Sequence, residues 1–115
     1  QIALVPNAAV DIFPITGSWV TASFDGTARV NNFSGEHGKC LIITSTDGRD
    51  KDYLCNAYRR ETGQVKSGDL VVSLESGEPL HRELIINGKS ITGSDPEEIY
   101  ENQLEAILEK YGRLE

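Results

Sequence analysis

The sequence predicts a mainly antiparallel β-domain (α+β by content), a small barrel or sandwich of about seven short strands with one C-terminal amphipathic helix. Two Asp-Gly and one Asn-Gly turn dipeptides each separate runs rich in β-branched and apolar residues. The final part of the 115-residue chain instead repeats its apolar residues with a helical period. We therefore expect an N-terminal arm or edge strand over 1–17, an antiparallel β body over 18–93 and a helix over 94–112.

The first 17 residues are apolar but interrupted by two prolines. Ala3–Val5 and Val10–Phe13 each suit a short edge strand, because proline is tolerated where no ladder donor is needed. The alternative is an ordered arm packed on the β body. Both interpretations place this segment at the border of the domain.

The first hairpin is expected to join 18–24 to 27–33 through a turn at Asp25-Gly26. Trp19 is the only tryptophan, and we expect it in the core, because single tryptophans are highly buried on average. The alternative is an aromatic side chain on a ligand-binding surface.

The second hairpin carries both cysteines of the chain. Residues 40–46 are rich in β-branched side chains, Asp47-Gly48 favours a type I′ turn, and 51–58 runs back. In this register, Cys40 faces Cys55 directly, at a Cα separation that a disulfide can bridge. Such a bridge stabilises the fold by about 3 kcal/mol in the chain-entropy model. The alternative is two reduced cysteines that pack as small hydrophobic residues.

A further strand is expected at 70–74. The third hairpin should join 80–86 to 89–91 through Asn87-Gly88, the strongest short hairpin signal in the chain.

The helix is expected to begin at Ser94-Asp95-Pro96-Glu97, which combines a capping side chain with proline in the first turn, and to end at Gly112. One apolar stripe should pack on the β body; the alternative is that the same stripe binds a partner or a second copy. The stripe consists of Tyr100, Leu104, Ile107, Leu108 and Tyr111.

The net charge of −7 argues against nucleic acid as a partner, because phosphate binding depends on Lys and Arg. No run is apolar and long enough to span a bilayer. The chain begins at Gln1, and Leu114-Glu115 resembles the remnant of an affinity tag. Together with the expected disulfide, these features predict a periplasmic or extracellular protein, with the option of membrane anchoring through a removed segment.

The sequence displays no catalytic constellation, metal site or cofactor motif. Glu36-His37 with Cys40 suggests a Cys–His nucleophile, which a disulfide at Cys40 would exclude. Three carboxylates gather at Asp47, Asp50 and Asp52; this is either a weak cation site or a solvated turn.

We therefore expect a non-catalytic extracytoplasmic domain of the bacterial envelope that binds another protein or stabilises an assembly. A specific version is an inhibitor or immunity-type protein whose acidic surface steers it to a basic enzyme. The alternative is a small-ligand or oligosaccharide-binding β-barrel, with Trp19, Tyr53 and Tyr58 lining its groove.

Overall fold

The structure, a computed structural model, describes residues 9–12, 19–32, 39–57, 59–74 and 79–112. Several expectations lie outside these residues. They are the strand at Ala3–Val5, the Glu36-His37 pair, Tyr58 and the C-terminal Leu114-Glu115.

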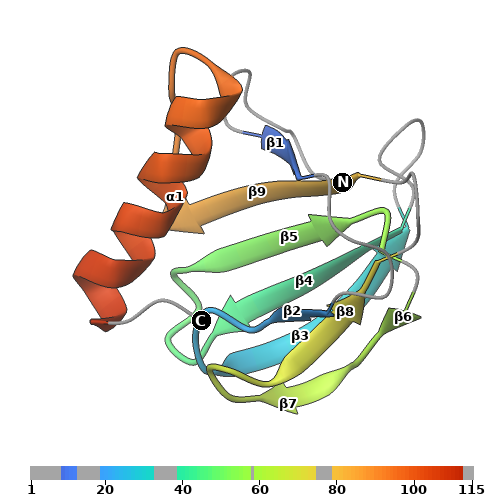
Figure 1. Cartoon of the computed structure of the whole chain (residues 1–115). Coiled ribbons are helices and arrows are strands. Elements are labelled where there is room, and N and C mark those ends of the chain that lie inside the picture. The colour runs from blue at the N-terminus through green and yellow to red at the C-terminus, as the bar shows by residue number, and fades with distance from the viewer. Residues whose placement is uncertain (1–8, 13–18, 33–38, 58, 75–78, 113–115) are drawn as a thin grey trace.

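Two antiparallel sheets and one helix make up the fold (Figure 1). The larger sheet has the order β1–β9–β5–β4–β3–β7, with β10 also paired to β9, and the smaller has the order β2–β8–β6. The larger sheet contains β1 (Ala9–Ile12), β3 (Gly26–Asn32), β4 (Lys39–Ser45), β5 (Lys51–Cys55), β7 (Gly63–Val65), β9 (Leu80–Ile86) and β10 (Lys89–Ser90). The smaller contains β2 (Trp19–Thr21), β6 (Arg59–Arg60) and β8 (Leu70–Ser73), and the helix is α1 (Pro96–Tyr111).

The predicted fold class is confirmed, in its sandwich form. Within the described strands, β1 and β7 end the larger sheet and do not pair with each other. β1 is an antiparallel edge strand on β9, as expected for Val10–Phe13, of which Phe13 lies outside the described residues.

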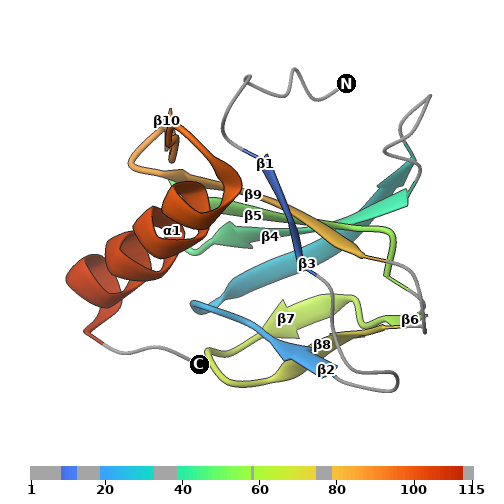
Figure 2. The same cartoon turned by 45° about the horizontal axis from the view of Figure 1, so that its top comes forward.

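The main core lies between one face of the larger sheet and a second layer made of the smaller sheet and α1 (Figure 2). Side chains alternate along β4, so Leu41 and Ile43 point into this core. Val71 and Val72 of β8 and Ile107 of α1 meet them from the second layer. The helix and the smaller sheet therefore cover the same face.

The cysteine hairpin has the predicted register, since Cys40 pairs with Cys55. Its turn is different from the prediction. Of the two residues Asp47 and Gly48, only Gly48 has a positive φ, of 80°. Gly48 N donates to Ser45 O within the loop of residues 46–49. The type I′ turn is found instead at Asn87-Gly88, where both φ values are positive, as predicted.

The predicted hairpin at Asp25-Gly26 is wrong. Strand β2 pairs with β8 in the smaller sheet, whereas β3 pairs with β4 and β7 in the larger one. Glycine is needed at residue 26 because a Cβ there would lie 2.0 Å from Thr44 O. The dipeptide thus permits a close strand approach where the chain crosses between sheets.

The prediction that Trp19 is a core residue is also wrong, because its side chain is 38% exposed. β2 is an edge strand of the smaller sheet. Ala22 and Phe24, which follow β2, are the residues that enter the core.

The helix has the predicted ends. Asp95 is the N-cap and accepts from Glu98 N, Glu98 Oε1 accepts from Ser94 N, and Gly112 has the left-handed conformation past the last turn.

The predicted buried stripe of the helix is partly wrong. Ile99, Gln103 and Ile107 are its buried residues, whereas Tyr100 and Leu108 are exposed. The buried face of the helix is therefore rotated relative to the stripe that was predicted from the apolar residues alone.

Candidate functional site

The C-terminal end of α1 is held to the sheet by Asp50, a fully buried carboxylate just before β5. Asp50 Oδ1 accepts from Asn87 N at 2.8 Å, and Oδ2 lies 2.7 Å from Lys110 Nζ. The hydroxyl of Tyr111 also donates to Oδ2. Asp50 therefore joins the β9–β10 turn, the helix end and the β4–β5 hairpin.

The electrostatics of this cluster keep Asp50 charged. Burial raises its pKa, but hydrogen bonds from Asn87 N, Lys110 and Tyr111 outweigh burial, so that the pKa is lowered below its usual value. The pKa of Tyr111 is raised, first by burial and then by its hydrogen bond to Asp50. The Tyr111 hydroxyl thus stays a hydrogen-bond donor at neutral pH.

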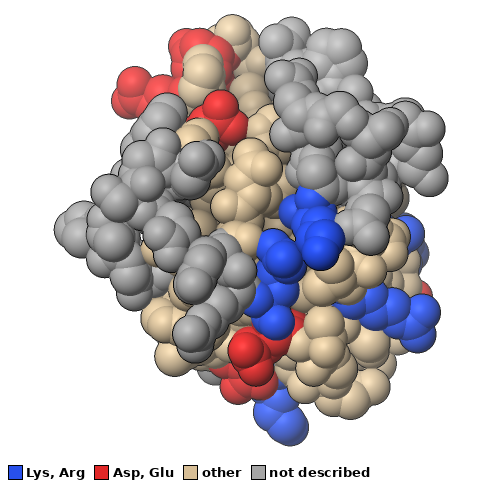
Figure 3. Space-filling view, turned by 90° about the vertical axis from the view of Figure 1, so that its right-hand side faces the viewer, with Lys and Arg blue, Asp and Glu red and all other residues tan. Residues whose placement is uncertain are grey.

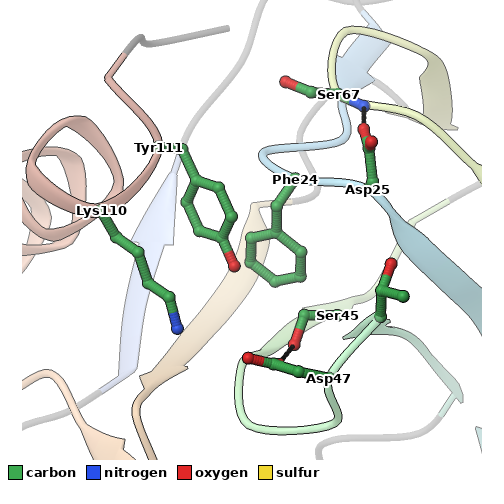
Figure 4. Close-up of a pocket in the computed structure, with 8 residues that line it drawn as sticks. Phe24, Asp25, Ser45, Asp47, Ser67, Lys110 and Tyr111 are labelled. Atoms are coloured by element: carbon green, nitrogen blue, oxygen red, sulfur yellow. Dashed lines mark hydrogen bonds between the residues drawn. The ribbon is translucent and has the colours of Figure 1, made fainter.

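A pocket of about 530 Å³ lies beside this cluster (Figure 4). Lys110 and Tyr111 extend from α1 on one side of the pocket, and Asp25 and Ser67 lie on the opposite side. Ser45 and Asp47 belong to the β4–β5 hairpin. The ring of Tyr111 stacks on Phe24, with centroids 5.2 Å apart. The lining residues are Phe24, Asp25, Ser45, Thr46, Asp47, Ser67, Lys110 and Tyr111.

Two carboxylates at the pocket are held in place by hydrogen bonds. Asp47 Oδ1 accepts from Arg49 N at 3.0 Å and from Ser45 Oγ at 2.7 Å, and these bonds lower the pKa of Asp47. Asp25 Oδ1 accepts from Ser67 N at 2.8 Å.

A second buried charge lies deeper in the core. Asp52 receives two hydrogen bonds of 2.9 Å from Arg82, whose Nη2 also donates to Ser23 Oγ at 2.9 Å. Burial lowers the pKa of Arg82, but the Asp52 carboxylate outweighs that effect, so the pKa of Arg82 is raised. This pair joins β5 and β9 to the segment that follows β2.

The three aspartates of the cysteine hairpin therefore have separate surroundings. Asp47 is exposed, Asp50 is bound to the helix end and Asp52 to Arg82. Among the described residues, no group of three or more His, Cys, Asp or Glu side chains is arranged to hold a metal ion. The suggested weak cation site at these aspartates has no support in this geometry.

Cys40 and Cys55 form the predicted disulfide, with a Cα–Cα distance of 4.1 Å. Both are buried with Tyr53 in a smaller cluster apart from the main core. Because the sulfur of Cys40 is bonded to Cys55, the Cys–His nucleophile is excluded in this state.

The residues predicted to line a ligand groove are not brought together. Trp19 lies in the smaller sheet, and the buried Tyr53 lies beside the disulfide. Neither lines the pocket at the helix end. That pocket is formed by residues from distant parts of the chain, and no local motif in the sequence marks it.

The outer face of α1 carries the exposed part of the predicted stripe. Tyr100, Leu104 and Leu108 recur every four residues and so form one row along the helix, with Leu108 47% exposed and Leu104 partly exposed. A parallel row of exposed acidic residues runs beside it, one position further along the chain. It consists of Glu97, Glu101, Glu105 and Glu109.

On the face at the right-hand side of Figure 1, where β6 lies, several Lys and Arg side chains gather, and Asp and Glu side chains are also visible there (Figure 3). Within the described part of the chain, no helix is both long and apolar enough to cross a membrane.

No protein-family model matches the chain, and no curated protein is significantly similar to it.

Proposed function

We propose that this protein is a non-catalytic extracytoplasmic domain that binds another protein through the outer face of α1. The observation that carries this proposal is the apolar row of Tyr100, Leu104 and Leu108 beside a row of glutamates. The apolar row extends for about 12 Å along the helix, at 1.5 Å per residue. Aligned apolar side chains on an exposed helix face are typical of helix-in-groove recognition.

The acidic row suggests the chemistry of the partner. A partner with an apolar groove bordered by Lys or Arg would contact both rows at once, and its charge would speed up association. This supports an inhibitor or immunity-type role against a basic protein. Association should then become slower as ionic strength rises, because salt screens exposed charges.

The disulfide supports the extracytoplasmic part of the proposal. Disulfides persist in oxidising compartments and are rare in the cytosol of mesophiles. We accordingly place the domain in the periplasm or outside the cell, in the bacterial envelope.

Site-specific photocrosslinking tests the interface. A benzoylphenylalanine at Glu101, within the acidic row, should crosslink to one discrete protein in native cells. The same group at Leu70, which is 56% exposed on β8, is the matched control and should not give this product. Combining Tyr100→Ala with Leu108→Ala should remove the product while leaving the far-UV spectrum unchanged, because both side chains are exposed.

The proposal is refuted if Glu101 gives no discrete product, or if both positions give the same products. Once the partner is identified, an association rate that does not change between low and high salt would contradict the electrostatic part.

A further inference from the structure

We propose that the uncovered outer edge of β3 binds an extended segment of another protein, with alternating apolar and acidic residues, as an added antiparallel strand. The second half of β3 lies toward the right of Figure 1, away from α1, so this site does not depend on the function proposed above. The inference rests on the path of the chain at β7, on the direction of the β3 backbone groups and on the local charge.

Strand β7 covers only the first part of β3. It pairs with residues 26–28, whereas β3 continues to Asn32. If β7 kept this register towards its N-terminal side, Glu61 would lie opposite Val30. Instead, Glu61 N donates to Val71 O, and β6 pairs with β8 in the smaller sheet. Within the described residues, the second half of β3 is therefore left without a neighbouring strand on this side.

The hydrogen bonds of β4 show which β3 backbone groups face this edge. Ser45 N donates to Asp50 O at 2.9 Å, so Ser45 and the other odd-numbered residues of β4 bond towards β5. The even-numbered residues of β4 accordingly bond to the odd-numbered residues of β3, with which they pair. The N–H and C=O groups of Val30 and Asn32 therefore point to the uncovered edge.

An apolar side chain is exposed at the same place. Val30 lies on the core side of the sheet, since it pairs with the buried Leu41, but it is 38% exposed. Among the described strands, the other edges are formed by β1, β2, β6, β7 and β10, which have four residues or fewer, whereas β3 has seven. Short edge strands protect a sheet against added strands, and β3 lacks this protection.

Positive charge surrounds this edge. Arg29 and Lys39 are exposed, and Lys39 pairs with Asn32. Together with Arg60 of β6 they outnumber Glu61, and none of the three cations is in a salt bridge within the described residues. Lys and Arg side chains gather on this side of the molecule (Figure 3). An acidic segment is therefore favoured over a second copy of the chain, because two copies would bring their Arg29 side chains into one interface.

The geometry of an antiparallel strand sets the pattern of the bound segment. A residue opposite Val30 would exchange both backbone hydrogen bonds with it and place its side chain on the core side, beside the exposed part of Val30. The next residue would point to the other side of the sheet, opposite Arg29. Apolar and acidic residues should therefore alternate.

NMR with a capped Glu-Val-Glu-Val-Glu peptide tests the edge. In the free protein, the amide hydrogens of Val30 and Asn32 should exchange with solvent faster than those of Arg29 and Asn31, which bond to β4. The peptide should shift the Val30 and Asn32 signals saturably, with a Kd below about 1 mM, and should slow their exchange. A Lys-Val-Lys-Val-Lys peptide should bind at least about tenfold more weakly.

N-methylated peptides test the strand pairing itself. N-methylation of both valines of the glutamate peptide removes the N–H groups that face β3 and should abolish the shifts. N-methylation of its central glutamate, whose N–H points away from β3, should preserve them.

Variants of the protein separate this edge from general charge attraction. Val30→Pro removes an N–H at the edge but no bond to β4, and it should weaken binding of the glutamate peptide at least about tenfold. Arg29→Glu, at an exposed position, should weaken it to a similar extent and should favour the lysine peptide instead. This second variant decides the matter if Val30→Pro does not fold. Arg49→Glu is the matched control: it reverses an exposed charge in the loop at the other end of β4 and should change binding less than about twofold.

The proposal is overturned if the Val30 and Asn32 amides are already protected in the free protein, by this chain or by a second copy. It is equally overturned by the absence of a saturable shift, by equal binding of the two unmodified peptides, or by the same weakening from Arg49→Glu as from Arg29→Glu. None of these results bears on the crosslink from Glu101 of α1, so the two interfaces fail independently.

Discussion

The buried ion pair between Asp52 and Arg82 makes a strong prediction about stability. Their side chains are only 1% and 7% exposed. Replacing Arg82 with Met removes the guanidinium and leaves a charged carboxylate in the core. Loss of one partner of a buried pair typically costs about 3–5 kcal/mol, and we expect this cost for Arg82→Met. Asp52→Leu should cost a similar amount, because Ser23 alone cannot neutralise Arg82.

The double variant Asp52→Leu with Arg82→Met should be more stable than either single variant. It leaves no unpaired charge, and its apolar side chains fill a similar volume, so a cost below about 2 kcal/mol is expected. The two substitutions are therefore strongly non-additive. Asp11→Asn provides an exposed comparison: it weakens the contact of Asp11 with His81, where Asp11 is 51% exposed, and should cost less than about 1 kcal/mol.

Urea unfolding of the oxidised protein at pH 7, followed by far-UV circular dichroism, measures all four variants. If a single variant fails to fold while the double variant folds, the predicted order still holds. The reasoning is refuted if the double variant loses the sum of the two single losses, or if Arg82→Met costs less than about 1 kcal/mol.

Three further predictions concern other parts of the fold. Gly26→Ala should lower the melting temperature markedly, because its Cβ would meet Thr44 O at 2.0 Å; a wild-type melting temperature would contradict this. Replacing Cys40 and Cys55 with Ser should cost about 3 kcal/mol in urea unfolding, and a loss under about 1 kcal/mol would count against the chain-entropy argument. Asp50→Asn should cost about 2 kcal/mol at pH 7. Since the folded pKa of Asp50 is below its usual 3.8, this contribution is present above pH 3.8 and is lost as pH falls through the folded value. The same cost at pH 7 and at pH 2 would therefore contradict the role assigned to its charge.

The features that depend on neighbouring residues were predictable from the sequence. The register of the cysteine hairpin and the Asn87-Gly88 turn follow from short runs around one turn. The two ends of the helix, at Asp95 and at Gly112, follow from capping rules. In each case the partners are close in the chain, so the local pattern contains the necessary information.

The errors arise where long-range contacts determine the result. The same Asp-Gly dipeptide occurs twice, and at Gly26 the close approach of Thr44 O, from a different strand, explains the glycine. The helix buries Gln103, although its apolarity is low, and its Nε2 lies 3.5 Å from Arg82 O. Contacts of this kind are not visible in a local pattern.

The candidate site was the least predictable part. In the sequence, Asp50 looks like an ordinary residue of a polar turn. Its contacts with Lys110 and Tyr111 form only in the folded chain. Trp19, the most conspicuous aromatic residue, lies elsewhere because β2 joins the smaller sheet.

The β4–β5 hairpin is fastened at both of its ends. The disulfide closes its base, and Asp50 ties its tip to the helix and to the β9–β10 turn. The bridge joins residues only 15 positions apart, so the hairpin alone can bring the two thiols together before β9 arrives. Formation of the disulfide therefore requires only the hairpin itself and not the docked helix. The amide hydrogens of β4 and β5 should accordingly be among the slowest in the chain to exchange with solvent.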